Sequence, residues 1–306
     1  MDPSRKKGVC LRSHRSALCI PRRLVYRLER VSLRKECSRD LMKRKPIALT
    51  IAGSDSGGGA GVQTDLKTFA SIGVHGTSVL TCVTAQNPSA VLGVQSISPT
   101  LITAQFDALQ NGLKPKAIKS GMLYSKRIVQ AVIEGLHGCA SARYVMDPVM
   151  VATSGAPLLK PDCVALMMRS LIPLADLITP NIAEAEALIG GRITKAQEAK
   201  EAAYAMAQKF KTPCLLKGGH LPEKGKVVDY LATGAEVISF SSAYIPRRQT
   251  HGTGCTYAAA ITAYLAQSYP LSEAVGLGKQ FITSAIQNSV RVGSYQALDP
   301  SRHGSS

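Results

Sequence analysis

Apolar and polar positions follow two alternating patterns along the chain from residue 46 onward. Short apolar runs such as Pro46–Gly53 end in glycine or polar residues, which is typical of buried β-strands. Stretches such as Val62–Ile72 place apolar residues three and four positions apart, which predicts helices that pack on one face. Because strand, glycine-rich loop and helix recur in this order, the pattern predicts an α/β fold. Its central, mostly parallel sheet should carry helices on both faces.

The same pattern sets the boundaries of these elements. It predicts strands over 46–53, 74–84, 117–121, 144–149, 177–180 and 214–219, and an antiparallel ribbon at 227–231 and 237–240. It predicts helices over 62–72, 100–111, 125–136, 161–171, 181–189, 194–210, 254–268 and 271–290. No stretch rich in proline, glycine and serine interrupts residues 46–296. We therefore expect one domain over 46–296 and a polar tail over 297–306, with fraying from Gln296 onward.

Basic residues are concentrated ahead of this domain. The chain has 306 residues and a formal net charge of +17, and residues 1–45 hold 15 Lys and Arg against 4 Asp and Glu. We expect this N-terminal extension to be disordered, or to be translated from a misplaced start, because Met42 lies just before the first strand. Targeting to an organelle is the second interpretation, since transit peptides are also Arg-rich and acid-poor. Nucleic-acid binding is the least favoured, because no aromatic interleaving or recognisable module accompanies the charge.

Eight cysteines are scattered through the chain without a C-x-x-C motif or zinc-ligand spacing. Several lie in apolar runs, as reduced buried cysteines do, and this indicates a reducing compartment. No apolar stretch of about 18 residues occurs that would predict a membrane-spanning helix. We therefore expect a soluble, cytoplasmic protein with no membrane partner.

Residues able to do chemistry follow the predicted strands, at the edge where open α/β sheets bind ligands. A Gly-rich loop, 54–61, follows the first strand, and Lys217 ends a later one. Gly252–Cys255 forms a tight turn at the start of a helix, where backbone N–H groups favour anions. A thiol in that first turn, Cys255, is expected to ionise easily and to be available as a base. The alternative is a glycine turn that only starts a packed helix, with an inert buried cysteine.

Two common nucleotide-binding signatures are absent from the sequence. There is no G-x-x-x-x-G-K-[ST] P-loop, and Gly57–Gly61 lacks the G-x-G-x-x-G spacing of dinucleotide-binding folds. An anion-binding turn, Lys217, and the carboxylate of Glu184 close to Asn181 nevertheless supply the parts that metal-dependent phosphoryl transfer needs. The residues alone therefore predict an α/β enzyme that handles a phosphorylated ligand.

Seven short motifs stand at the predicted strand ends and in the anion-binding turn. They occupy residues 52–65, 84–87, 119–122, 147–150, 179–185, 217–220 and 251–256. In this order they resemble the hydroxymethylpyrimidine/phosphomethylpyrimidine kinases of thiamine biosynthesis, which belong to the ribokinase-like superfamily, and the resemblance covers about residues 46–292. It implies a ribokinase-like fold, Mg²⁺ as cofactor and ATP as co-substrate. The implied activity is phosphorylation of 4-amino-5-hydroxymethyl-2-methylpyrimidine and then of its monophosphate to the diphosphate.

The resemblance also implies which residues hold the pyrimidine. Gln86 is expected to hydrogen-bond the aminopyrimidine edge, because its amide offers a donor and an acceptor together. Gly53, Asp55, Met122 and Val149 match positions that line the family's pyrimidine pocket. From the residues alone, Met122 and Val149 are equally well read as core residues, and Gln86 as an ordinary turn residue.

The resemblance implies further residues around ATP. Lys217, Asn181 and Thr253 are expected to contact the nucleotide, and Glu184 and Asp147 to hold magnesium, mainly through water. Their alternatives are a strand-end surface lysine, a helix N-cap followed by a solvated first-turn acid, and a turn-forming aspartate.

Catalysis falls to the residues of the anion-binding turn, Gly252, Thr253, Gly254 and Cys255. Their amides are expected to surround the transferring phosphoryl group. As a hypothesis, Cys255 is the base that takes the hydroxyl proton in the first transfer. Most ribokinase-like enzymes have aspartate at the position of Cys255, which argues against a sugar kinase. Some relatives carry lysine where this chain has Thr153, which leaves open how well the second transfer runs.

Two other functions remain open on the sequence. The first is a pyridoxal kinase of the same superfamily, since some relatives with cysteine in this loop accept pyridoxal. The second is a non-catalytic protein that binds a vitamin precursor, although the presence of Asn181, Glu184, Lys217 and Cys255 argues against it. The expected partners are the pyrimidine alcohol, its phosphate and ATP, together with a second copy of the chain in a homodimer.

Overall fold

The computed structural model describes residues 44–152, 155, 158–219, 221, 225–246 and 251–300. The chain divides into a unit of Met1–Arg44 and a unit of Lys45–Ser306, and the fold is that of the second unit. The expected N-terminal extension up to residue 43 lies outside the described residues, as do Thr153 and residues 301–306 of the expected tail.

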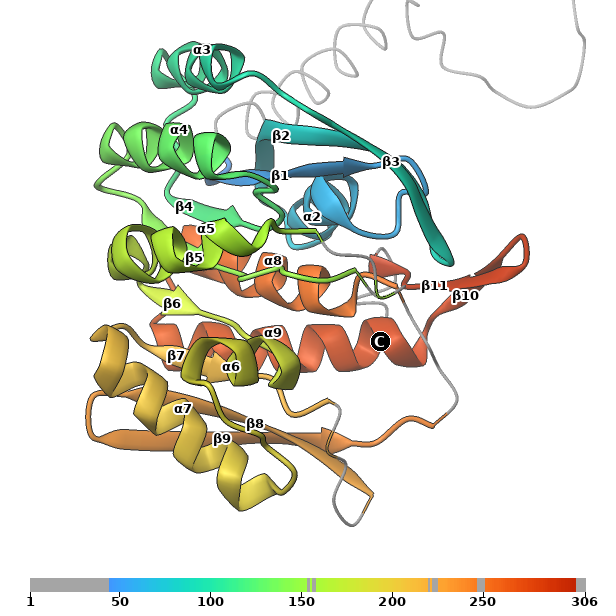
Figure 1. Cartoon of the computed structure of the whole chain (residues 1–306). Helices are drawn as coiled ribbons and strands as arrows, with labels where there is room; N and C mark the ends of the chain where they lie inside the picture. The colour runs from blue at the N-terminus through green and yellow to red at the C-terminus, as the bar shows by residue number, and fades with distance from the viewer. Residues whose placement is uncertain are drawn as a thin grey trace, which may run out of the picture. The chain divides into compact units, whose positions relative to one another are not determined.

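A nine-stranded, mostly parallel sheet forms the centre of the described part of this unit (Figure 1). Its strand order is β3-β2-β1-β4-β5-β6-β7-β8-β9. Neighbours from β2 to β7 are parallel, whereas β3 at one edge and β8 and β9 at the other are antiparallel. The strands are β1 (Ile47–Asp55), β2 (His75–Asn87), β3 (Ala90–Ser96), β4 (Ala117–Ser120), β5 (Arg143–Met146), β6 (Leu177–Ile178), β7 (Cys214–Leu216), β8 (Lys226–Thr233) and β9 (Glu236–Ala243). A small hairpin of β10 (Val290–Val292) and β11 (Tyr295–Ala297) stands apart from this sheet.

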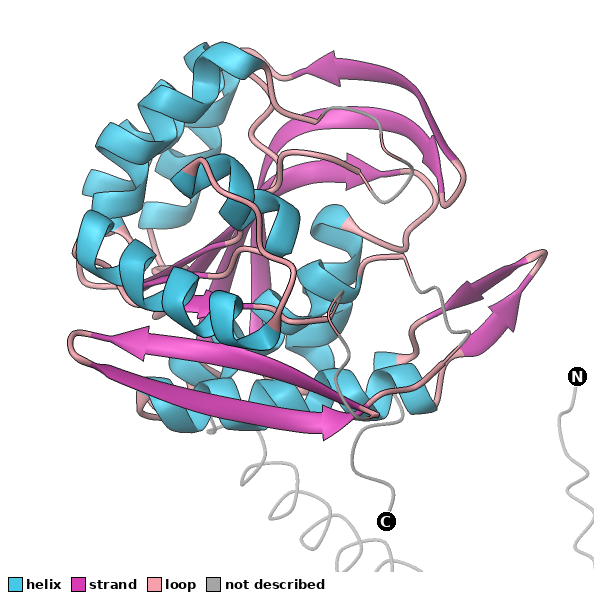
Figure 2. Cartoon of the chain, turned by 60° about the horizontal axis from the view of Figure 1, so that its bottom comes forward, coloured by secondary structure: helices cyan, strands magenta, loops and turns pink. Residues whose placement is uncertain are grey.

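Helices cover both faces of the sheet (Figure 2). One face carries α3 (Pro99–Gln110), α4 (Lys126–His137), α5 (Pro161–Leu166), α6 (Ile182–Ile189) and α7 (Ala196–Phe210). The other face carries α2 (Gly61–Ser71), α8 (Thr253–Ala266) and α9 (Leu271–Gln287). A π-helical turn, Met167–Leu171, and a 3₁₀ turn, Ile172–Leu174, continue α5. The predicted fold class is therefore confirmed.

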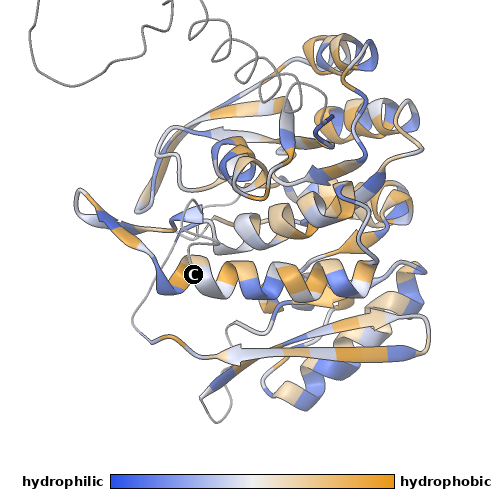
Figure 3. Ribbon diagram, turned by 180° about the vertical axis from the view of Figure 1, so that it is seen from behind, coloured by the Kyte–Doolittle hydropathy of each residue, from blue (hydrophilic) through white to orange (hydrophobic). Residues whose placement is uncertain are grey.

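The inner strands are apolar on both sides, because successive side chains point to opposite faces. Ile118 and Met146 join the core under α3–α7, whereas Ala117 and Val145 join the core under α2, α8 and α9. Helix α8 is buried along most of its length. Figure 3, which views this second face, shows α8 mainly in pale to orange colours. The buried helix starts at the anion-binding turn, so the core holds the start of α8 against the sheet.

Most element boundaries agree with the sequence pattern, but two elements were missed. The first is β3, whose residues are all exposed or half-buried, so its short apolar run, residues 90–94 with Gly93 inside it, does not mark a buried strand. The second is the β10–β11 hairpin. The expectation that the chain frays from Gln296 is wrong up to residue 300: Gln296 lies in β11, Leu298 packs against the second core and Pro300 is buried.

No helix in the described part of the chain is both long enough and apolar enough to cross a membrane.

Candidate active site

A cavity lies where the carboxyl ends of β1, β2 and β4 meet the start of α8. The strand registers align these ends, with Asp55 of β1 opposite Thr84 of β2, and Ile51 of β1 opposite Ser120 of β4. The residues that line the cavity are Ala52, Gly53, Ser54, Asp55, Ala60, Gly61, Thr84, Gln86, Lys119, Gly121, Met122, Val149, Leu158 and Cys255. The structure therefore brings all five residues that were expected to hold the pyrimidine into one cavity with Cys255, although they come from separate parts of the sequence.

Asp55 shapes the Gly-rich loop that forms one wall of this cavity. Its Oδ1 accepts the N–H of Gly57 at 2.9 Å, and its Oδ2 accepts the N–H groups of Ala60 at 2.9 Å and Gly59 at 3.2 Å. Burial alone would raise the pKa of this carboxyl, but the hydrogen bond from His251 and the loop amides lower it below the ordinary value. Asp55 is therefore an ionised anchor that fixes the loop as well as a lining residue.

Gln86 and His251 form the polar side of the cavity. Nε2 of His251 lies 3.0 Å from Oδ2 of Asp55 and 3.2 Å from Nε2 of Gln86. The Oε1 of Gln86 accepts the hydroxyl of Thr84 at 3.2 Å. Thr84 thus holds the amide oxygen of Gln86 at the position where Gln86 was expected to meet the pyrimidine. The His251 nitrogen that donates to Asp55 cannot also accept from the Gln86 amide. The sequence motif contained His251, but we had assigned it no role.

The anion-binding turn packs closely against the Gly-rich loop. Gly252 has φ +85° and caps α8, and a Cβ atom there would lie 1.8 Å from the carbonyl oxygen of Gly59. The first turn of a helix leaves N–H groups without acceptors in the helix itself, and the N-cap residue here, Gly252, has no side chain that could accept them. A Cβ atom at Gly254 would lie 3.2 Å from Nζ of Lys217. The turn therefore places helix-start amides, the Lys217 ammonium and the Cys255 thiol side by side.

Cys255 is a neutral thiol at physiological pH. Burial raises its pKa to about 11, and the carboxylates of Asp65 and Asp147 add to this, while the Lys119 ammonium and the Gly61 amide oppose it. The expectation that the first turn of α8 makes this thiol ionise easily is therefore wrong for the ligand-free protein. Loss of hydration outweighs the helix terminus here, because buried surroundings disfavour the charged form.

Alkylation of Cys255 by iodoacetamide should therefore be at least about tenfold slower at neutral pH than that of an exposed cysteine, because only thiolate reacts. Its rate should increase about tenfold per pH unit as the pH rises toward the thiol pKa. Quantitative mass spectrometry of the peptide that contains Cys255 measures this, with Cys255→Ser as the blank. Labelling as fast as that of a free thiol at pH 7 would contradict the assignment of a neutral thiol.

Lys217, Asp147 and Glu184 form a second, charged cluster next to the turn. Nζ of Lys217 lies 2.8 Å from Oδ1 of Asp147, which also accepts the hydroxyl of Thr179 at 3.1 Å. Burial raises the pKa of Glu184 to about 7, with the Lys217 ammonium acting against this. Because Lys217 reaches both this cluster and Gly254, the two parts of the site are continuous.

Asn181 and Glu184 start α6 with a reciprocal pair of hydrogen bonds. The side chain of Asn181 accepts the N–H of Glu184 at 2.9 Å, and Oε2 of Glu184 accepts the N–H of Asn181 at 2.8 Å. This capping box fixes Glu184 at the carboxyl end of β6. The backbone of Asn181 also pairs with that of Lys217. The contacts of Asn181 thus agree with its interpretation as a helix N-cap.

The donor set of this cluster suits magnesium held together with a phosphorylated ligand. No group of three or more His, Cys, Asp or Glu in the described residues is placed to hold a metal alone. Magnesium, however, prefers oxygen ligands and is commonly bound by one or two carboxylates plus phosphate oxygens and water. Asp147 and Glu184 supply two such carboxylates, and the Lys217 ammonium that contacts Asp147 lies beside the anion-binding turn. The residues therefore fit the ion.

Sequence reasoning assigned no role to a buried ion pair below the cavity. Nζ of Lys119 lies 2.9 Å from both carboxylate oxygens of Asp65, and neither side chain is exposed. The hydroxyl of Thr50 donates to the same carboxylate at 2.6 Å. A signal was present, because a lysine in the middle of the buried strand β4 must have a counter-charge nearby.

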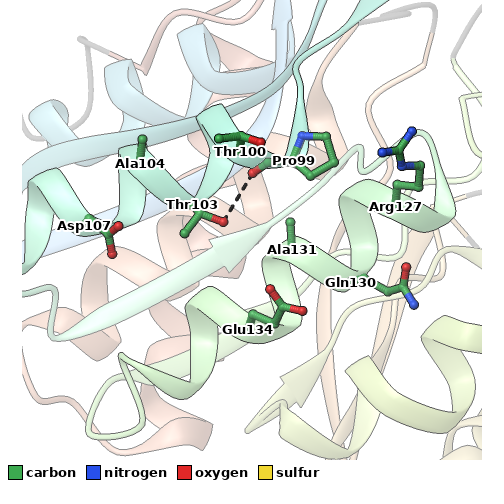
Figure 4. Close-up of a pocket in the computed structure, with 9 residues that line it drawn as sticks. All are labelled: Pro99, Thr100, Thr103, Ala104, Asp107, Arg127, Gln130, Ala131 and Glu134. Atoms are coloured by element: carbon green, nitrogen blue, oxygen red, sulfur yellow. Dashed lines mark hydrogen bonds between the residues drawn. The ribbon is translucent and has the colours of Figure 1, made fainter.

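A second pocket of about 560 Å³ lies on the outer surface between α3 and α4 (Figure 4). Residues of those two helices line it, and none belongs to the seven motifs. It does not face the carboxyl ends of the strands, so we place the site at the smaller cavity.

Comparison with known proteins gives a consistent result. Residues 55–298 match the family model described as phosphomethylpyrimidine kinase. The chain is 45% identical over 260 residues to the hydroxymethylpyrimidine/phosphomethylpyrimidine kinase of Rhizobium meliloti, covering 84% of this chain and 96% of that one. It is also 45% identical over 239 residues to a thiamine biosynthesis bifunctional protein of Geobacter sulfurreducens, covering 78% of this chain and 49% of that one.

A solved structure with this fold is the pyridoxal kinase from Staphylococcus aureus in complex with AMP-PCP and pyridoxal. It has a TM-score of 0.77 and 31% sequence identity, and the match covers 85% of this chain and 95% of that one.

Proposed function

Because the chain belongs to the phosphomethylpyrimidine kinase family, we propose that it transfers the γ-phosphate of ATP to the hydroxymethyl group of 4-amino-5-hydroxymethyl-2-methylpyrimidine. It then phosphorylates the monophosphate to the diphosphate, for thiamine diphosphate biosynthesis. The observation that supports this best is the cavity itself, which Gly53, Asp55, Gln86, Met122 and Val149 line together with Cys255. The names of the relatives support the reaction. The roles that we give to individual site residues rest on the geometry of the cavity.

In this proposal, a polar side chain of the cavity hydrogen-bonds the acceptor, and two apolar side chains cover its ring. The amide of Gln86 offers a donor and an acceptor to a ring nitrogen and its neighbouring amino group, and the ligand displaces its contacts with Thr84 and His251. Met122 and Val149 cover the ring, and Gly53 lets the ring approach the backbone of β1. Asp55 holds the Gly-rich loop in the shape that completes the cavity.

The nucleotide phosphates lie between Lys217 and the amides of Thr253, Gly254 and Cys255. Lys217 neutralises charge on the transferring phosphoryl group, and Asn181 fixes the start of α6 next to it. Asp147 and Glu184 would hold magnesium here, and the bound ion would supply further charge neutralisation. An ATP analogue in the related pyridoxal kinase supports the use of ATP.

In the first transfer, the acceptor oxygen forms a bond to the γ-phosphorus while the bond from that phosphorus to the β,γ-bridging oxygen breaks. The hydroxyl proton leaves toward Cys255. In the second transfer the acceptor is an anionic phosphate that carries no such proton, so it needs little help from a base. This proposal also includes a cytoplasmic homodimer. The free thiols of the described cysteines are in keeping with a reducing compartment, and the dimer rests on the resemblance.

An ATP-consumption assay with purified protein tests the proposal against its rivals. We expect turnover with both the pyrimidine alcohol and its monophosphate, and kcat/KM for pyridoxal lower by at least about tenfold, because a site built to pair with an aminopyrimidine leaves polar groups unpaired with another ring. A higher kcat/KM for pyridoxal would make the protein a pyridoxal kinase. Tight ligand binding without any ATP turnover would make it a non-catalytic binding protein.

A further inference from the structure

The ion pair of Lys119 and Asp65 is an unusual feature for the centre of a folded domain. Both side chains are fully buried, and Thr50 contributes the further hydrogen bond to Asp65. Taking two charges out of water is costly, and replacement of such pairs by apolar side chains often leaves stability unchanged or higher. Stability therefore gives little reason to place a lysine in β4, where its neighbours Ala117 and Ile118 are apolar.

The location of Lys119 suggests a different reason. Lys119 and Cys255 line the same cavity, from β4 and α8. An ammonium group has three N–H donors, and the two oxygens of Asp65 take two of them. Within the part of the chain that the structure describes, this leaves one donor for the cavity. The ion pair thus holds a positive charge next to the place where the acceptor hydroxyl and the Cys255 thiol meet.

Charges from several elements act on the sulfur of Cys255. The ammonium of Lys119 acts on it, as do the carboxylates of Asp65 and Asp147 and the amide of Gly61. Lys217 interacts with it from the end of β7. Asp65 and Lys119 partly offset each other, and the Lys119 ammonium is the larger of the two influences on the sulfur. Lys119 is accordingly the group that favours negative charge on the sulfur most strongly.

We propose that Lys119, held in place by Asp65, is a positioning residue for the first phosphoryl transfer. Its ammonium stabilises the negative charge that is shared between the Cys255 sulfur and the acceptor oxygen. In that step the O–H bond of the acceptor breaks, its proton goes to the Cys255 thiolate, and the oxygen forms the new bond to phosphorus while ADP leaves. Lys119 keeps its proton throughout. The proposal rests on the proposed function and adds to it the residue that makes a cysteine usable as a base here.

The variant that tests this is Lys119→Met/Asp65→Asn. It removes the pair together, because removal of one partner alone leaves an uncompensated buried charge. Asparagine retains an acceptor for the Thr50 hydroxyl. Alkylation of Cys255 at alkaline pH should fall about tenfold relative to the unchanged protein, which corresponds to about one pKa unit. The rate of the first transfer should fall at least about tenfold, and the second transfer should stay within about threefold, because only the first needs the hydroxyl proton removed.

The chain offers a matched control in a second buried pair. Lys279 and Asp229 lie 2.7 Å apart with little exposure, join α9 to β8 and do not line the cavity. Lys279→Met/Asp229→Asn should lower thermal stability in a comparable way but leave the alkylation profile of Cys255 unchanged. A further variant, Lys119→Arg, keeps the positive charge and the donors to Asp65, and alkylation and the ratio of the two transfers should stay within about threefold of the unchanged protein. If the Lys119→Met/Asp65→Asn variant does not fold, the Lys119→Arg variant tests the proposal in its place.

The outcomes separate this proposal from the proposed function. Alkylation does not depend on any substrate, so a protein without kinase activity can still show the coupling of Lys119 to Cys255, and only the proposed function would then fail. An unchanged alkylation profile in a folded double variant overturns the role of Lys119. Equal loss of the two transfers overturns it as well, as does a Lys119→Arg variant that loses the first transfer selectively.

Discussion

Replacement of Gly252 by alanine is expected to lower kcat/KM for both phosphoryl transfers by at least about 100-fold, since a misplacement of about 1 Å in a catalytic constellation has effects of this size. The added Cβ atom would lie 1.8 Å from the carbonyl oxygen of Gly59, so the anion-binding turn and the Gly-rich loop cannot keep their present contact. Either the amides of residues 253–255 or the wall of the acceptor cavity must move. Steady-state kinetics with each acceptor measures the loss.

Gly73→Ala is the matched control for Gly252→Ala. Gly73 has φ +84°, nearly that of Gly252, but a Cβ atom there meets no heavy atom within 4 Å. Both variants therefore carry the backbone strain of a left-handed non-glycine residue, about 1–2 kcal/mol. Gly73→Ala should lower the melting temperature and leave kinetics unchanged. Full activity in folded Gly252→Ala would mean that the contact of turn and loop does not position the phosphoryl group.

The central fold was predictable because the inner strands are buried on both faces and most helices on one. A run such as residues 47–52 is short, mainly apolar and followed by glycine, and these features depend only on local composition. The edge strand β3 and the β10–β11 hairpin are largely exposed. An exposed strand is stabilised by pairing with a neighbour, and its sequence alone carries little of that information.

The residues that line the cavity were predictable to about the same extent as the central fold. Polar residues at the carboxyl ends of parallel strands must converge, and this brought Asp55, Gln86 and Cys255 to one cavity. Their partners were not predictable in the same way. The contact of His251 with Asp55 spans 196 positions of the sequence, and it depends on how the turn before α8 packs on the first loop.

The ionisation of Cys255 was likewise not predictable from its local sequence. Its place in the first turn of α8 is visible in the sequence and favours thiolate. Its burial and the carboxylates of Asp65 and Asp147 come from elements far away in the chain, and together they raise the thiol pKa to about 11. Local position therefore predicted the wrong direction of the shift, because desolvation is a property of the whole fold.

Cys255→Ala is expected to lower the rate of the first transfer by about 10²–10⁴, the usual contribution of a general base, and to lower that of the second by less than about tenfold. The reason is that the hydroxyl acceptor must lose a proton, whereas the monophosphate is already an anion. Single-turnover measurement with the alcohol and with the monophosphate, each as sole acceptor, separates the two half-reactions. Equal loss in both would show that Cys255 only shapes the cavity.

Cys255→Ser distinguishes a base from a group that merely fills the same space. Serine keeps the size and the hydrogen bonding of the thiol but is a far weaker acid, so it should not restore the first transfer if the sulfur takes the proton. The high pKa of the Cys255 thiol in the free protein also predicts the direction in which the rate of the first transfer changes with pH. A base that is protonated at neutral pH becomes more available as the pH rises, so the first transfer should accelerate between about pH 7 and 9 while the second does not. A serine variant with full first-transfer activity, or a pH response shared by both transfers, would remove the proton-acceptor role from Cys255 and leave the anion-binding amides and Lys217 as the groups that drive the reaction.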